Sequence, residues 1–189
     1  METTRSCHAL RKLHLVKCFL KPVDGQGLAQ AIASGAFPRL EDLSLRYNEK
    51  MGNEAFTAIL KALQEGGCRE LKHLNLAESY LGNEPCAMFG DFLSSDHCQQ
   101  LQSLDMGRAF YDKGSACNFF RSIIAARYTV PCFPAIRSLR IGGGDKLEAE
   151  LAALLRFKSS LEPPTVKKLS NRDWFPTVIS HEPKPRRVW

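Results

Sequence analysis

Apolar residues recur along the chain at a fixed set of spacings. In residues 71–81 they stand at positions 0, 3, 5 and 10 of the segment, and a small polar residue stands at position 8. Positions 3 and 5 are two residues apart, which is typical of a β-strand that turns both side chains to one face, and the break after position 5 predicts a turn. The same pattern starts at five places in the chain, which are Leu10, Leu40, Leu71, Leu101 and Ile136.

These starts are 30, 31, 30 and 35 residues apart, and a repeat of that period indicates stacked units instead of one compact core. One strand per unit, with positions 3 and 5 turned inward, predicts two buried columns of side chains. Position 3 supplies the first column, which contains Leu13, Leu43, Leu74, Leu104 and Leu139. Position 5 supplies the second, which contains Leu15, Leu45, Leu76, Met106 and Ile141.

A helix is predicted after each strand. In the second unit Asn53 is expected to cap the helix, Gly66 and Gly67 to end it, and an apolar stripe at i, i+3, i+4 and i+7 to cover the core. That stripe contains Phe56, Ile59, Leu60 and Leu63, and the third and fourth units repeat its register. In the first unit residues 19–27 hold Pro22 and two glycines, so we expect a loop there, followed by a short helix.

The pattern LxxLxLxx(N/C)xL followed by a helix resembles the leucine-rich repeat, and the period near 30 resembles its ribonuclease-inhibitor-like subclass. The resemblance implies an α/β solenoid, a horseshoe arc of about five to six repeats with parallel concave strands and convex helices. We expect residues 1–160 to form this array and residues 161–175 to be a degenerate terminal repeat or cap. Residues 176–189 would be a basic, proline-containing tail.

What the resemblance implies about function is protein binding, since ribonuclease inhibitors, nucleotide-sensing receptor arrays and activators of small GTPases use such scaffolds. No catalytic motif of those families maps onto this chain. By strand parity His14 and His73 face the concave side, but the sequence places no Ser or Cys to be activated by either. We therefore expect a non-enzymatic scaffold with an unidentified protein partner, without cofactor or small-molecule substrate. End-to-end contacts or a longer repeat array stay open.

The concave surface should be formed by positions 2, 4 and 6 of each repeat, because side chains alternate along a strand. Together with residues just beyond the strands, they predict a polar docking surface with charges of both signs. We expect a partner to be anchored near Tyr47 and the charged pair Arg46 and Glu78. The full candidate set is His14, Asp42, Ser44, Arg46, Tyr47, His73, Asn75, Glu78, Asp105, Arg108 and Arg140.

The seven cysteines contain no Cys-x-x-Cys pair, and five of them occupy repeat positions that favour a small buried side chain. These five are Cys7, Cys18, Cys68, Cys86 and Cys98. The sequence therefore predicts reduced, buried thiols, with no disulfide framework and no metal site.

The net charge of +6 is concentrated at the two ends of the chain. Residues 1–23 carry five Lys or Arg against one acid and residues 158–189 carry seven against three, whereas residues 24–157 carry 14 against 16. A nucleic-acid-binding array should instead show a continuous basic stripe. Binding of nucleic acid or an acidic membrane through the basic C-terminal segment is the alternative function.

Apolar runs are short. The longest without proline is residues 151–155, far below the length of a membrane span, and four basic residues interrupt any signal-peptide core near the N-terminus. We expect no transmembrane segment and a cytoplasmic protein, with the nucleus as the other location.

Overall fold

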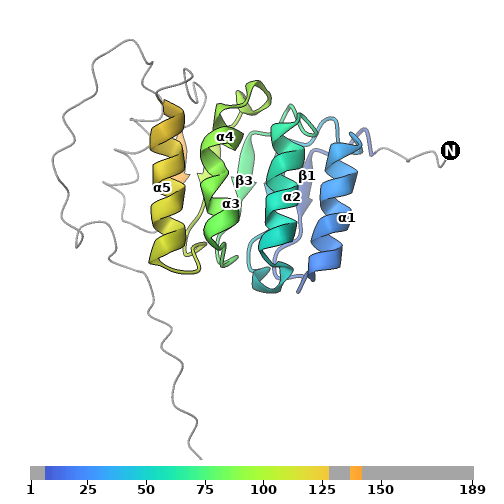
Figure 1. Ribbon diagram of the computed structural model, residues 1–189. Helices are drawn as coiled ribbons and strands as arrows, with labels where there is room; N and C mark the ends of the chain where they lie inside the picture. Colours follow the sequence, from blue (N-terminus) through green and yellow to red (C-terminus); the bar gives the residue numbers. More distant parts are fainter. Residues whose placement is uncertain (1–6, 128–136, 142–189) are drawn as a thin grey trace, which may run out of the picture.

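The computed structural model describes residues 7–127 and 137–141, and within them the chain is an α/β protein with a parallel sheet (Figure 1). The five strands pair in chain order, β1-β2-β3-β4-β5. Their bounds are Lys12–His14 for β1, Asp42–Ser44 for β2, His73–Asn75 for β3, Ser103–Asp105 for β4 and Ser138–Arg140 for β5. The expected cap at residues 161–175 and the basic tail at residues 176–189 lie outside the described residues.

Helices connect the strands and lie in a row on one side of the sheet (Figure 1). The long helices are α1 (Pro22–Ala33), α2 (Asn53–Gln64) and α5 (Lys113–Arg127). Two short helices, α3 (Asn83–Ala87) and α4 (Phe89–Ser94), connect β3 to β4, and 3-10 turns occupy Glu49–Met51 and Asp96–Cys98. Parallel neighbours require such a crossover after every strand.

The strand register is the one that the sequence predicts. Leu13 pairs with Leu43, Leu43 with Leu74, Leu74 with Leu104 and Leu104 with Leu139. From the second strand onward both predicted columns are buried, and Leu43, Leu45, Leu74 and Leu76 are at most 1% exposed. Burial of the first pair was predicted wrongly: Leu13, in β1 at one edge of the described sheet, and Leu15, just after it, are only half-buried.

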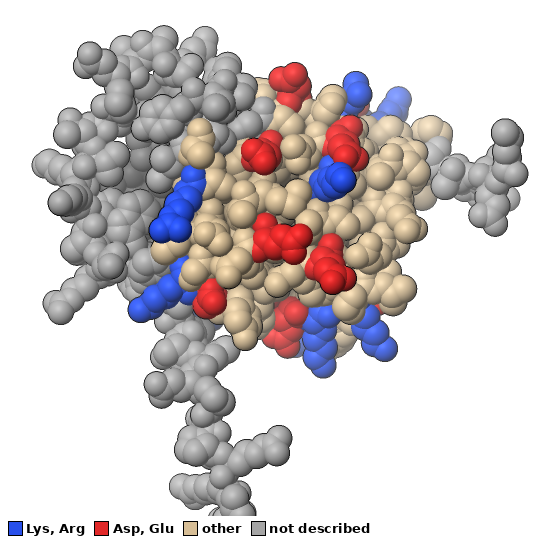
Figure 2. Space-filling model, viewed as in Figure 1, with Lys and Arg blue, Asp and Glu red and all other residues tan. Residues whose placement is uncertain are grey.

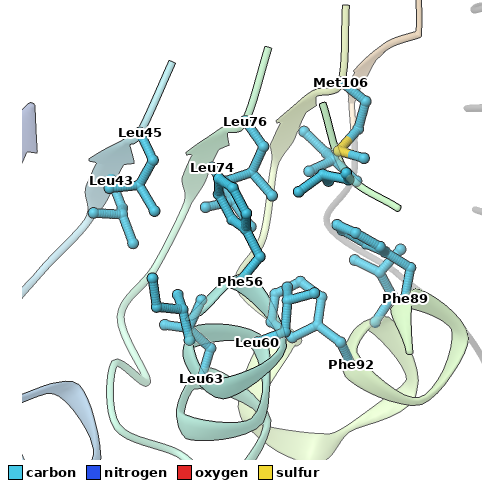
Figure 3. Packing of buried hydrophobic residues seen from close by; sticks show 14 of the residues in the cluster. Leu43, Leu45, Phe56, Leu60, Leu63, Leu74, Leu76, Phe89, Phe92 and Met106 are labelled. Atoms are coloured by element: carbon cyan, nitrogen blue, oxygen red, sulfur yellow. The ribbon is translucent and has the colours of Figure 1, made fainter. Parts of the chain in front are cut away.

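The core lies between the sheet and the helix row. Figure 3 shows leucines of β2 and β3 facing Phe56, Leu60 and Leu63 of α2. The predicted stripe of α2 is buried throughout. Further along the sheet the core becomes aromatic, and the ring of Phe89 packs edge-on against that of Phe119 with centroids 5.1 Å apart. This continuous apolar layer holds the strands in register.

The loop expected at residues 19–27 is largely helical, because α1 already begins at Pro22. Proline is favourable in a first helical turn, and the Asp24 side chain accepts a hydrogen bond from the backbone N–H of Lys21 (2.8 Å). Gly25 lies where α1 meets α2, and a Cβ there would come within 2.6 Å of the Ala55 Cβ. The glycine thus permits helix contact and does not mark a loop.

The helix after β2 also begins differently from the prediction. Gly52 is the N-cap residue and Asn53 is the first helical residue. The Asn53 side chain accepts a hydrogen bond from the backbone N–H of Gly82 (2.8 Å), so it links two neighbouring units instead of capping its own helix. A glycine with φ of 81° at position 52 explains the shift, since that conformation places the cap one residue earlier.

Helix α5 is capped by Asp112. Its Oδ1 accepts hydrogen bonds from both the backbone N–H and the hydroxyl of Ser115, each 2.8 Å long. Both bonds stabilise the carboxylate and lower the pKa of Asp112, and the bond from the backbone N–H has the larger effect.

We expect the substitution Asp112→Ala to lower the free energy of unfolding by about 1 kcal/mol at neutral pH, the usual effect of losing an N-cap. A lowered native pKa stabilises the fold above the pKa of the unfolded chain and loses that effect as the pH falls through the native value. The difference between wild type and variant in urea unfolding should therefore shrink as the pH falls below about 4, the ordinary pKa of an aspartate. Asp112→Asn, which keeps an acceptor oxygen, is the control, and equal stability of Ala and wild type at neutral pH would contradict the capping assignment.

Candidate functional site

The sheet has one face that no described helix covers, opposite the helix row (Figure 1). We call it the open sheet face. It is defined by the outward side chains of the strands and of the residues two positions beyond them. These are Lys12, His14, Val16, Asp42, Ser44, Arg46, His73, Asn75, Ala77, Ser103, Asp105, Gly107, Ser138 and Arg140.

Polar side chains on this face interact across strands and with the turns that follow. His14 Nε2 lies 3.0 Å from Asp42 Oδ2. Asn75 Oδ1 accepts a hydrogen bond from the backbone N–H of Ala77, and Asp105 Oδ1 accepts one from Gly107, each 3.0 Å long. The side chains of Asn75 and Asp105 therefore close the turns after β3 and β4 as well as facing outward.

The predicted contact residue Ser44 cannot reach a partner, because its side chain is only 6% exposed. In the register of the sheet it lies between His14 and Asn75, whose longer side chains rise on both sides. The other candidates on the strands stay accessible: His14, His73 and Arg140 are exposed, and Asp42, Asn75 and Asp105 are half-buried.

The predicted charged pair of Arg46 and Glu78 is not formed. The guanidinium of Arg46 lies 4.6 Å from the centroid of the Tyr47 ring, and Arg46 Nη2 donates a hydrogen bond to the Tyr47 hydroxyl (3.2 Å). Glu78 pairs with Arg108 instead, with 3.6 Å between Oε1 and Nη1. The reason is register: Glu78 and Arg108 occupy position 7 of adjacent units, and the backbone N–H of Glu78 donates to Gly107.

Residues at the strand ends adopt an uncommon backbone conformation. Six non-glycine residues in the described part of the chain have φ between 51° and 61°. They are Lys17, Phe19, Tyr47, Glu78, Tyr80 and Arg108. Four of them stand at position 7 of successive units, and each such left-handed residue costs about 1 kcal/mol or more. Sequence reasoning missed this feature, since left-handed residues are normally signalled by Gly, Asn or Asp.

All of these residues except Arg108 line an open pocket of about 210 Å³ beyond the ends of β1, β2 and β3. We call it the strand-end pocket. It is lined by Lys17, Phe19, Tyr47, Asn48, Glu49, Lys50, Glu78 and Tyr80. Only Tyr47 and Glu78 belong to the predicted site; the other six are additions. Phe19, Glu49, Lys50 and Tyr80 lie beyond the strands, where alternation along a strand gives no information.

The floor of the pocket is held by Asn48, a buried residue at position 8. Its Nδ2 donates hydrogen bonds to the carbonyls of Leu15 (2.6 Å) and Leu45 (2.9 Å), and its Oδ1 accepts one from the N–H of Leu20 (3.3 Å). One amide thereby satisfies backbone groups of two neighbouring units. Ser79, at the same position of the next unit, donates to Leu45 (3.3 Å).

The opposite ends of the strands are linked by a second charged group. Glu41 lies between Arg11 and Lys72 and forms an ion pair with each, the one to Lys72 measuring 2.9 Å. The hydrogen bond from Lys72 is the main cause that lowers the pKa of Glu41, and Arg11 adds to it. All three side chains reach solvent, so the group ties three units together without forming a buried site.

The six described cysteines comprise two exposed residues, three buried ones and the half-buried Cys117. Cys68, Cys86 and Cys98 are buried, and burial raises the pKa of their thiols to about 12, about 12 and about 11. Burial of Cys7 and Cys18 was predicted wrongly, since both are exposed in the first unit, where no further unit is described beside them. Cys132 lies outside the described residues.

This division predicts a labelling pattern. In the native protein a thiol reagent at mildly alkaline pH should modify Cys7 and Cys18 rapidly, because both residues are exposed to the reagent. Cys68, Cys86 and Cys98 should react only after unfolding. Mass spectrometry of the labelled peptides distinguishes the groups, and rapid native modification of Cys68 and Cys98 would contradict the burial.

Within residues 7–127 and 137–141 no group of three or more His, Cys, Asp and Glu side chains is arranged to hold a metal ion. No helix among the described residues is long and apolar enough to cross a membrane.

The two histidines of the open sheet face differ in their polar contacts. His73 makes no side-chain hydrogen bond within this part of the chain, and His14 has Asp42 beside it. Within the described residues, neither histidine therefore forms a side-chain hydrogen bond with a Ser or a Cys.

Comparison with the known protein families finds no matching family model, and comparison with curated proteins finds no significant match.

Proposed function

We propose that the protein is a non-enzymatic scaffold of the leucine-rich repeat type, ribonuclease-inhibitor-like, that binds a protein partner on its open sheet face. Support for the repeat assignment comes from the register, because positions 3 of five units pair with one another along the sheet. Units with a helix on one side and a strand on the other bury a continuous core only by stacking.

One observation carries the proposed function: a sheet face that no described helix covers, with polar side chains and charges of both signs. His14, His73 and Arg140 are exposed there, with Asp42 and Asp105 half-buried between them. A surface of this kind suits polar docking with a folded protein and offers little to an apolar ligand. The repeat period spreads it over five strands, so a partner can contact several units at once.

The charge of the helix side does not suit nucleic-acid binding, which is the alternative function. Acidic side chains are spread across its middle, and most of the Lys and Arg lie towards its margins (Figure 2). Exposed acids of the helices include Glu54, Glu84 and Asp91. A phosphate backbone requires the opposite charge. The basic C-terminal segment of the alternative function lies outside the described residues.

The proposed location is the cytoplasm. Its support is the cysteine pattern: the buried thiols Cys68, Cys86 and Cys98 are unpaired, and disulfide-poor, cysteine-containing chains are typical of reducing compartments.

The test is a pull-down from lysate with a matched pair of variants. Arg46→Glu with Tyr47→Ala reverses a charge on the open sheet face and removes the half-exposed ring that borders it. Lys61→Glu with Val23→Ala makes the same charge change and removes one exposed apolar side chain on the helix side, where Val23 is 71% exposed. We expect partners to be lost at least tenfold with the first variant and retained with the second. Retention of every partner by a folded first variant would refute binding at the open face.

A further inference from the structure

The strand-end pocket collects the left-handed residues of the described chain. Five of the six line the pocket, and the sixth, Arg108, forms an ion pair with Glu78 of the lining. Left-handed backbone at non-glycine residues persists where the surrounding structure enforces it, and it gathers at ligand-binding sites. Four of the six stand at position 7 of successive units, so the backbone conformation belongs to a turn that the units share; what distinguishes the pocket is the bulky side chains that occupy these turns.

The side chains at these positions are not those that a turn needs. Glycine, asparagine and aspartate enter the left-handed region most readily, whereas these positions hold lysine, phenylalanine, tyrosine, glutamate and arginine. Burial does not account for the rings either, because Phe19 is 65% exposed and Tyr47 is 42% exposed. The ring of Phe19 is therefore accessible to another molecule, and so is part of the Tyr47 ring, whose other contact is with Arg46.

We propose that the strand-end pocket is the anchor point of the partner and takes one aromatic side chain from it. This inference rests on the proposed function, since it presumes a protein partner on the open face. The volume of about 210 Å³ is below the roughly 300 to 1,000 Å³ of small-molecule sites and suits one large side chain. Tyr47 also borders the open sheet face, where Arg46 stacks on its ring, so the anchor adjoins the docking surface.

The charges of the lining select a neutral occupant. The lining holds two lysines, Lys17 and Lys50, and two glutamates, Glu49 and Glu78, so it has no net charge and gives neither a cation nor an anion a net attraction that would offset the loss of its hydration. A neutral ring has no charge to desolvate and can pack against the rings of Phe19, Tyr47 and Tyr80. The four charged groups then form the polar rim that surrounds a binding hot spot.

Glycine substitutions separate a binding function of the rings from a structural one. Phe19→Gly with Tyr47→Gly relieves two left-handed positions, so we expect an unchanged melting temperature or a rise of about 2–4 °C. Tyr111→Gly is the control, since Tyr111 is an aromatic residue that is 70% exposed and has no positive φ, and its loss should lower the melting temperature slightly. A clear fall for the double variant, beyond that of the control, would show that the rings are structural and overturn the proposal.

Binding is tested with single-residue probes in NMR titrations of the full chain. N-acetyl-tyrosinamide should shift the amide signals of Tyr47, Glu49 and Tyr80 with a dissociation constant in the millimolar range, as expected for a ligand of this size. N-acetyl-argininamide and N-acetyl-aspartamide should bind at least about fivefold more weakly, a difference of about 1 kcal/mol. The Phe19→Gly, Tyr47→Gly variant should lose the response to the tyrosine probe.

Absence of shifts with the tyrosine probe, or equal or tighter binding of the arginine or aspartate probe, would overturn the aromatic anchor. These outcomes would not decide whether a partner binds the open sheet face, which the pull-down tests separately. Conversely, retention of all partners by Arg46→Glu, Tyr47→Ala in the pull-down would refute the proposed function whatever the probes show. The two failures are therefore distinguishable.

Discussion

Replacing Leu74 with alanine is expected to lower the free energy of unfolding by about 2 to 5 kcal/mol, the range for a fully buried leucine. Leu74 is 1% exposed and lies in the middle strand of the five, between Leu43 and Leu104 in the register. Neighbouring strands and helix α2 fix its surroundings (Figure 3), so the cavity cannot close easily. Urea unfolding followed by circular dichroism measures the change.

Leu13 supplies the control, because it occupies the same position on the edge strand and is only half-buried. Leu13→Ala should cost clearly less, below about 2 kcal/mol, since less apolar surface is re-exposed to water. A cost for Leu74→Ala no larger than that for Leu13→Ala would show that the assigned register and the position of the core are wrong.

The second large effect is expected for Gly90→Ala in helix α4. A Cβ at this position would lie 2.5 Å from the carbonyl carbon of Ser122 and closer still to its oxygen. The obstacle is backbone of α5, which cannot rotate away as a side chain would, and the N–H of Gly90 also donates to Ser122 Oγ (3.1 Å). Helices α4 and α5 must separate, so we expect a loss of about 3 kcal/mol or more.

Gly27→Ala is the matched control for the helical glycine. Gly27 lies inside α1, and a Cβ there would have nothing within 4 Å. This substitution should raise the free energy of unfolding by about 0.5 to 1 kcal/mol, because alanine favours the helix. If Gly90→Ala were also neutral or stabilising in the same unfolding assay, the close packing of α4 on α5 would be refuted.

The register of the sheet could be predicted from the sequence because it depends on local alternation and on a repeat that occurs five times. Leu43, Leu74 and Leu104 pair as their spacing requires. Helix starts were less predictable. Gly25 looked like a loop residue, and only the approach of Ala55 from the next unit shows why a helix has a glycine there. Such contacts join residues that are 30 positions apart, and they leave no local signal.

The candidate site was predictable to a similar extent. Strand parity placed His73 and Asp105 on the open face, but it could not show that Ser44 is covered by its neighbours. The pairing of Glu78 with Arg108 depends on the left-handed turns after the strands. Those turns hold bulky residues in place of glycine or asparagine, so no residue type at these positions indicated a left-handed turn.

The most direct test of the central claim, that a protein partner occupies the open sheet face, is site-specific photocross-linking. A benzophenone amino acid is introduced at His73 or Arg140 on the open face, and at Lys61 or Ala87 on the helix side, all of which are exposed. After irradiation in lysate, the account predicts the same covalent partner from both open-face positions and none from the helix positions. Adducts formed from Lys61 or Ala87 alone would contradict it.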